Sequence, residues 1–140
     1  MAAGRYFTLD EANEALIELR PLAEEMVERR RLLVEAQMLR AELGGQVAGN
    51  GGDLTPSDFA DADAELEQAA GALAQVIERI QAAGVLVKDL DRGLLDFPSR
   101  RAGEDILLCW HVGEDDIRFW HGVEEGFAGR KPLSDLGLDP

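Results

Sequence analysis

The sequence predicts an α+β protein, in which a long antiparallel helical hairpin precedes a small antiparallel β-meander. Three observations predict this order: two helix-start signals in the first half of the chain, apolar residues at helical spacing after each signal, and short apolar runs separated by turn residues after Gly84. With 140 residues the chain has the usual size of one domain, so we expect a single domain over residues 1–140.

The first helical segment is expected over residues 8–43. Thr8 and Glu11 have the spacing of a capping box, in which each side chain bonds the backbone amide of the other residue. Apolar residues then recur every three or four positions up to Leu43. Pro21 lies inside this pattern, and because proline lacks an amide hydrogen it predicts a kink or a break.

Residues 44–54 contain five glycines, which predicts a flexible connector. Thr55, followed by Pro56, is a second helix start, and the second helical segment is expected over residues 55–84. Its apolar residues alternate steps of three and four, the spacing of a coiled-coil seam that includes Phe59, Leu66, Leu73 and Ile80. Two helices alone cannot bury such stripes, so either the C-terminal sheet or a second copy of the chain must cover them.

Residues 85–130 are expected to be rich in β-strands. Apolar runs at 85–90, 94–97 and 106–112 are bounded by turn residues and predict three strands of a meander. The segment 117–121 fits either a fourth strand or a short helix. The tail at 131–140 contains two prolines and is expected to be extended along the surface or frayed.

The charge of the chain excludes several classes of partner. It carries 28 acidic and 14 basic residues, a formal charge of −14 that repels nucleic acid and anionic membrane surfaces. Cys109 is the only cysteine, so no disulfide can form within the chain. The sequence also lacks a signal-peptide pattern and any run of ~18 apolar residues, so we expect a cytoplasmic protein.

Four segments resemble a known family: YFTLDEAN near the start, then KDLDRGLLDFP, LLCWHVGEDDIRFWH and GFAGRKPL. Together they are similar to the small bacterial proteins called domain of unknown function 2203. The resemblance implies a bacterial cytoplasmic protein and carries no activity with it. At His111 the family pattern implies a basic residue, so a function that needed His111 would not be shared by the family.

The sequence holds no phosphate-binding glycine motif and no hydrolase motif, but residues 109–125 are dense in metal-ligand types. One interpretation is that His111 and His121 are hydrogen-bonded residues at a strand edge. The other is a site for Zn, Mn or Fe, or a general base, built from His121 with Glu114 and Glu124, or with His111.

Strand geometry sets a condition on this metal site. If Trp110 and Phe119 both point into the core, alternation places Cys109 and His111 on one face and His121 on the Phe119 side. Regular strands then do not bring the two histidines together, whereas a turn or helix from Trp120 onward could. Asp89, Asp91 and Asp96 are the remaining carboxylate candidates, and we expect them to be solvated turn charges, which is a simpler explanation than cation binding.

Two hypotheses about function follow. The first is a protein-interaction or structural module that uses the seam of Phe59, Leu66, Leu73 and Ile80 to form a homodimer or to bind a protein partner. The second is a divalent-metal-binding protein or metal-dependent enzyme. The residues do not name an activity, a substrate or a partner.

Overall fold

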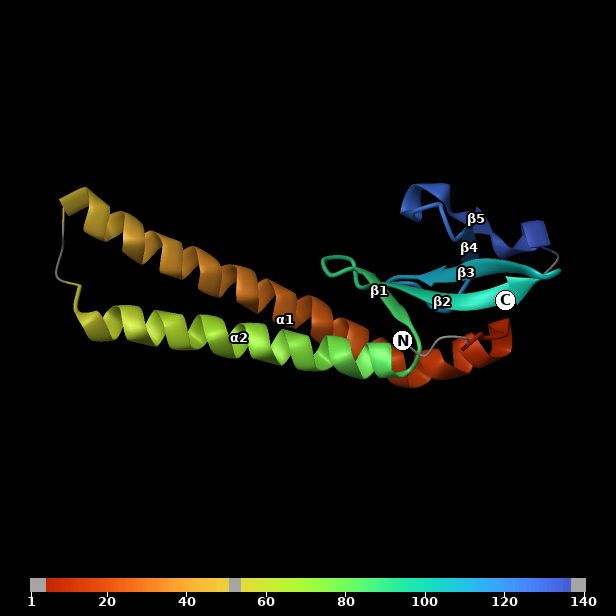
Figure 1. The fold of residues 1–140 in the computed structure, drawn as a ribbon, viewed down its shortest axis with the longest axis horizontal. Coiled ribbons are helices and arrows are strands. Elements are labelled where there is room, and N and C mark those ends of the chain that lie inside the picture. The colour runs from red at the N-terminus through yellow and green to blue at the C-terminus, as the bar shows by residue number, and fades with distance from the viewer. Residues whose placement is uncertain (1–4, 51–53, 137–140) are drawn as a thin grey trace.

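The computed structural model describes residues 5–50 and 54–136, and it confirms the predicted α+β class. Two long helices precede a five-stranded antiparallel sheet (Figure 1). The elements are α1 (Leu9–Asn50), α2 (Pro56–Ala82), β1 (Leu86–Asp89), β2 (Leu94–Arg101), β3 (Glu104–Trp110), β4 (Phe119–Gly122) and β5 (Lys131–Pro132), with short 3-10 helices η1 (Phe127–Gly129) and η2 (Leu133–Leu136).

The start of α1 confirms the predicted capping box. The Thr8 amide donates to Glu11 Oε1 at 2.9 Å, and the Glu11 amide donates to Thr8 Oγ1 at 3.0 Å. Pro21 lies inside the helix without ending it. Figure 1 shows that the red N-terminal part of α1 runs at an angle to the orange remainder, as expected for a proline kink.

The predicted connector at 44–54 is wrong in its first part, because α1 continues through Gly44 and Gly45 to Asn50. Two glycines cost a helix about 1 kcal/mol each, so contacts with α2 must offset the loss. Arg40 supplies such contacts: its Nε lies 2.6 Å from Asp63 Oδ1, and its guanidinium lies 4.9 Å from the centroid of the Phe59 ring. Residues 51–53, also part of that connector, lie outside the described residues.

Helix α2 begins where the sequence predicts. The Thr55 amide donates to Asp58 Oδ2 at 2.8 Å, and Pro56 occupies the first helical position. After the helix, Gly84 adopts a φ of +87°, which lets the chain turn sharply into β1. Within the described residues, no helix is long and apolar enough to cross a membrane.

The sheet is a meander with strand order β1-β2-β3-β4-β5, in which every neighbouring pair is antiparallel. The segment 117–121, which the sequence left open between strand and helix, contributes to β4 as a strand. The tail at 131–140 was expected to be extended along the surface or frayed: its first residues are extended as β5, which pairs with β4, and residues 137–140 lie outside the described residues. Leu133 is buried and its amide donates to the Arg118 carbonyl at 2.9 Å, which ties this segment to the sheet.

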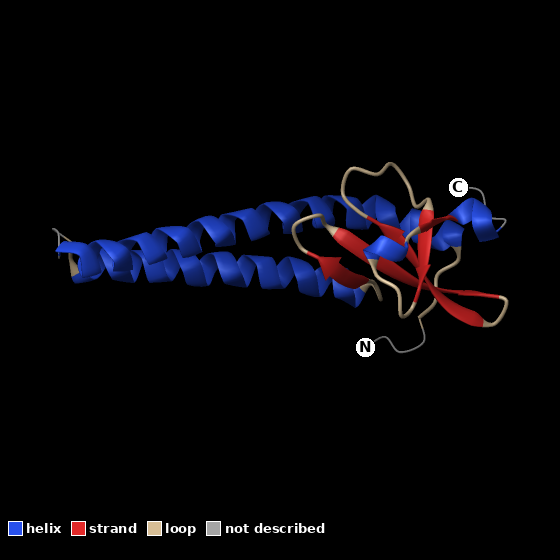
Figure 2. Ribbon diagram, turned by 90° about the horizontal axis from the view of Figure 1, so that it is seen from above, coloured by secondary structure: helices blue, strands red, loops and turns tan. Residues whose placement is uncertain are grey.

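One face of the sheet packs on the helices (Figure 2). Side chains of alternate residues on β2 and β3 enter the same core as residues of α1 and α2: Leu95, Phe97, Leu108 and Trp110 meet Leu16, Leu19, Met26, Val76 and Ile80. Residues that pair across antiparallel strands point to the same face, and successive residues of one strand point to opposite faces. The residues that alternate with these core residues therefore point to the other side of the sheet. That opposite face carries the polar residues described below.

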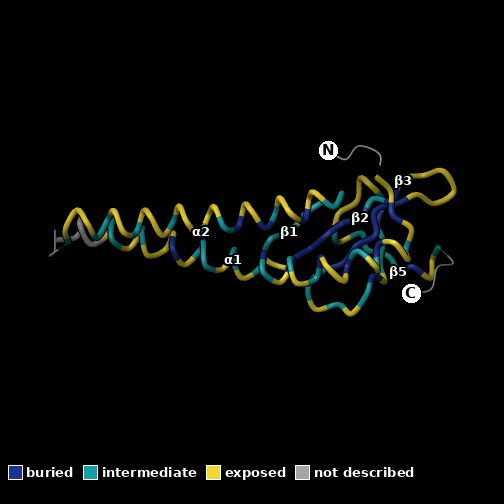
Figure 3. The backbone as a smooth tube through the Cα atoms, turned by 90° about the horizontal axis from the view of Figure 1, so that it is seen from below, coloured by how far each residue is buried: buried dark blue, intermediate teal, exposed yellow. Residues whose placement is uncertain are grey.

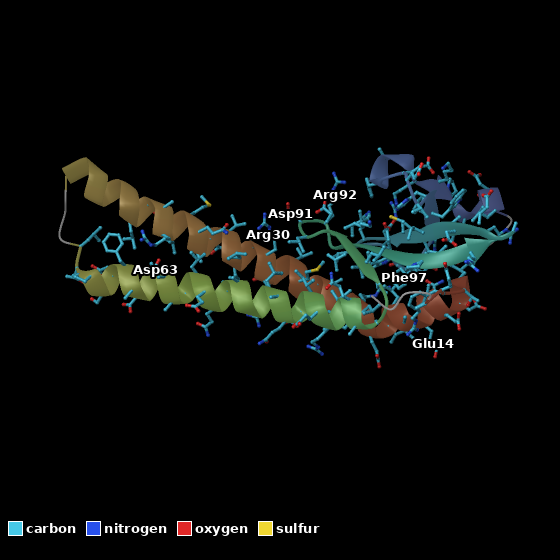
Figure 4. All side chains as sticks on the ribbon, in the orientation of Figure 1. Glu14, Arg30, Asp63, Asp91, Arg92 and Phe97 are labelled. Carbon is cyan, nitrogen blue, oxygen red and sulfur yellow. The ribbon has the colours of Figure 1, made fainter. Side chains whose placement is uncertain are left out.

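The sheet covers only the base of the hairpin. In Figure 3 the two helices extend well past the sheet, and the buried segments concentrate near it. Figure 4 shows Arg30 beside Asp91 where the helices leave the sheet, and Arg30 Nε lies 3.4 Å from Asp91 Oδ1. We call the part of the hairpin beyond this contact, residues 31–50 and 54–72, the arm.

Candidate metal centre

Three adjacent strands place Asp96, Cys109 and His121 together on the sheet face away from the helices. Asp96 on β2 is the register partner of Cys109 on β3, and His121 on β4 is paired with Leu107, two residues from Cys109. All three residues are at least 98% buried. One potential ligand atom from each of them lies within 4.8 Å of the others.

The two ring nitrogens of His121 have different partners. Nδ1 lies 2.8 Å from the Gly122 carbonyl oxygen, and Nε2 lies 3.0 Å from Asp96 Oδ2. A carbonyl oxygen can only accept, so the Nδ1 proton must be present for this bond to form. Nε2 therefore either carries a second proton that it donates to the carboxylate, or uses its lone pair as an acceptor or a metal ligand.

Asp96 has one carboxylate oxygen with no hydrogen-bond partner. This atom, Oδ1, is buried, and none of the described residues donates to it. Leaving a buried acceptor without a partner costs about 1–3 kcal/mol, and more for a charged group. A cation bound between the three side chains would remove this cost.

Cys109 is a neutral thiol in the metal-free protein. Its burial, and next the negative charge of Asp96, raise its pKa to about 12. A thiol with this pKa is almost fully protonated near neutral pH, so it is a poor nucleophile.

Arg130 and two aromatic rings lie over this part of the sheet. The guanidinium of Arg130 is 4.1 Å from the centroid of Phe119 and 4.9 Å from that of Phe127. Its Nη2 donates to the Cys109 carbonyl at 3.2 Å and to Glu114 Oε1 at 2.6 Å. Because Phe119 is the register partner of Cys109, these groups shield the site from water.

The ligand set predicted from the sequence differs from the one that the structure brings together, which is Asp96, Cys109 and His121. Glu114 accepts from Arg130 and from the His111 amide at 2.9 Å, and His111 Nε2 lies 3.8 Å from Glu114 Oε2. Glu124 is exposed in the turn after β4. His121 therefore meets Asp96 and Cys109, which belong to other strands, instead of Glu114, Glu124 or His111.

Sequence reasoning missed this grouping for two reasons. Asp96 was interpreted as a solvated turn charge, which is wrong, because it is buried inside β2 between Leu95 and Phe97. The condition that Phe119 points into the helical core is also wrong, because Phe119 shares the face of Cys109 and packs under Arg130. Once Phe119 is placed on the same face as Cys109, strand alternation places His121 on that face as well.

The four seam residues are divided between core and arm. Leu73 and Ile80 are buried at the base of the hairpin, where they pack within the chain. Phe59 and Leu66 are half-buried in the arm. The base of the seam is thus already covered, and only its far end is accessible to another molecule.

No curated protein and no solved structure matches the chain. A family model matches residues 5–133. This range includes both long helices, all five strands of the sheet and the three residues of the candidate centre. This match covers nearly the whole chain. The chain therefore belongs to the family described as "Uncharacterized conserved protein (DUF2203)".

Proposed function

We propose that the chain binds a divalent transition-metal ion, with Asp96, Cys109 and His121 as the protein ligands. The observation that carries this proposal is the meeting of three buried ligand-type side chains within 4.8 Å, one of which has an unpartnered carboxylate oxygen. Ligand atoms around one zinc ion lie roughly 3–4 Å apart, since zinc bonds are about 2.0–2.3 Å long. Small rotations of the side chains would bring the present separations into this range.

The donor set favours zinc over the harder metals. A thiolate and an imidazole suit Zn²⁺ or Fe²⁺, whereas Mg²⁺, Ca²⁺ and Mn²⁺ prefer oxygen ligands. The ionised forms of Cys109 and Asp96 would together cancel the two positive charges of the ion, so the buried site would be neutral.

The orientation of His121 supports the same proposal. Metal-binding histidines generally donate their second N–H to a carbonyl or carboxylate, which fixes the ring. The bond from Nδ1 to the Gly122 carbonyl has this role, and it leaves Nε2 directed at the cluster. A reduced cysteine ligand fits the cytoplasm, the compartment in which we place this function.

Metal content of the natively purified protein tests the proposal. We expect about one equivalent of zinc or iron by elemental analysis, and we expect Cys109→Ser and His121→Ala to lose it. Glu124→Gln and His111→Gln are matched controls, and both should retain the metal. Cobalt titration of the metal-free protein gives a second readout, because a thiolate ligand produces a charge-transfer band that Cys109→Ser removes. Full metal content in both ligand variants, or no binding by the wild type, would refute the proposal.

A second candidate function, docking through the arm, is favoured by a separate observation. The arm extends past the sheet, and it exposes two large apolar side chains, Met38 at 66% and Leu39 at 53%. Exposed apolar residues on a two-helix arm are expected where another chain or a second copy completes the packing. Sedimentation equilibrium over micromolar concentrations measures self-association directly, and a homodimer through the arm should be weakened by Leu39→Asp. A monomer at every concentration would exclude the homodimer, and docking to a different protein would be the version of the proposal that stands.

A further inference from the structure

A groove lies between α1 and α2 in the arm. It has a volume of about 320 Å³ and is lined by Leu39, Leu43 and Ala62 together with Glu42, Asp58, Asp61 and Glu65. The apolar members fall on both helices, so the groove follows the line along which the two helices meet. An apolar groove flanked by carboxylates on both helices is an unusual surface for solvent alone to cover.

The charge of the surrounding chain is of one sign. Residues 41–78 contain eight acidic residues and neither lysine nor arginine. Arg40 precedes this stretch, and its charge is already paired with Asp63 at 2.6 Å. The field at the groove is therefore negative, and it attracts cationic partners.

A second copy of the chain fits this groove poorly. Two grooves facing each other would bring like charges together, which opposes association. The nearby arginines of the hairpin each already contact an acidic residue, so compensation would require these contacts to be exchanged: Arg29 with Glu25 at 3.4 Å, Arg30 with Asp91 at 3.4 Å and Arg31 with Glu28 at 2.5 Å.

We propose that the groove binds a cationic amphipathic helix of a partner protein, an inference that rests on the docking function proposed for the arm. The apolar face of such a helix covers Leu39, Leu43 and Ala62, and its lysines or arginines meet the flanking carboxylates. This is the helix-in-groove mode, in which an apolar stripe at helical spacing anchors the ligand. The third helix supplies the covering surface that two helices lack.

A designed peptide tests the proposal with the full-length protein. The probe is a helical peptide of leucine and lysine with the leucines on one face, and its control is a scrambled peptide of the same composition. We expect the triple variant Glu42→Gln, Asp61→Asn and Glu65→Gln to bind the probe about tenfold more weakly, equal to about 1.4 kcal/mol. The triple variant Glu14→Gln, Glu18→Gln and Glu24→Gln, which changes the net charge equally outside the groove, should bind within about threefold of the wild type.

Leu39→Gln separates the apolar contact from charge. It keeps helix propensity and is expected to weaken the probe several-fold, while the scrambled peptide binds weakly to every variant. Equal weakening by the two triple variants, or equal binding of the two peptides, would mean that only net charge matters and would overturn the inference. A homodimer that the groove variant abolishes would also overturn it, because a second copy would be the occupant, yet the docking function would stand.

Discussion

Replacing His121 by alanine in the metal-free protein should cost about 1–3 kcal/mol of unfolding free energy, the usual cost of leaving a buried acceptor without its hydrogen-bond donor. Asp96 is only 1% exposed, and its single described hydrogen bond is the 3.0 Å contact with His121 Nε2. Its other oxygen already lacks a partner. Without the imidazole the buried carboxyl group keeps only the neighbouring Cys109 thiol as a donor. The loss is a substantial part of the stability of a domain, which is typically about 5–15 kcal/mol.

Urea unfolding followed by circular dichroism, with a chelator present, measures this loss. The double variant His121→Ala with Asp96→Ala should be more stable than the sum of the single effects predicts, because it removes both members of the pair. His111→Ala is the matched control, since this ring is 30% exposed, and it should cost less than about 1 kcal/mol. A cost below about 1 kcal/mol for His121→Ala, or strict additivity of the two single variants, would refute the reasoning.

Two further predictions concern single residues near the site and the hairpin base. In the folded, metal-free protein the pKa of Cys109 is raised from 9.0 to about 12. Above pH 9 the unfolded chain releases the thiol proton while the folded protein keeps it, so the wild type should lose up to about 1.4 kcal/mol of stability per pH unit. Cys109→Ala should lack this added loss in urea titrations at pH 8, 9 and 10, and parallel curves for the two proteins would contradict the assignment. Gly93 has a φ of +64°, and a Cβ there would lie 2.5 Å from a methyl carbon of Val112, so Gly93→Ala should destabilise by well over the ~1–2 kcal/mol of left-handed strain alone. Gly103→Ala, with a φ of +81° and no atom within 4 Å, should show only the strain, and equal melting temperatures for the two variants would exclude the clash.

The helices could be predicted because their signals are local. Thr8 with Glu11, and Thr55 with Pro56, mark helix starts within a few residues, and the structure confirms both. The end of α1 could not be predicted in the same way. Gly44 and Gly45 favour a stop, but packing of α1 along α2 overrides this local preference, and such tertiary contacts are invisible in the sequence.

The candidate centre depends on strand register, which sequence patterns specify weakly. His121 was a predicted ligand, yet its neighbours come from β2 and β3 at sequence separations of 25 and 12 residues. Only the pairing of Asp96 with Cys109 and of Leu107 with His121 brings them together. A wrong assumption about the direction of one ring, Phe119, was enough to place His121 on the other face, because strand faces alternate with every residue.

The continuous course of α1 separates the groove in the arm from the candidate centre on the sheet. From Met26, which is buried at the sheet, to Leu39, where the groove begins, the helix rises roughly 20 Å, at about 1.5 Å per residue. The groove and the candidate centre are thus too far apart to share side chains, and substitutions at one should leave the other intact. Substitutions on the outer turns of the two helices would then change the proposed groove without changing the side chains of the candidate centre.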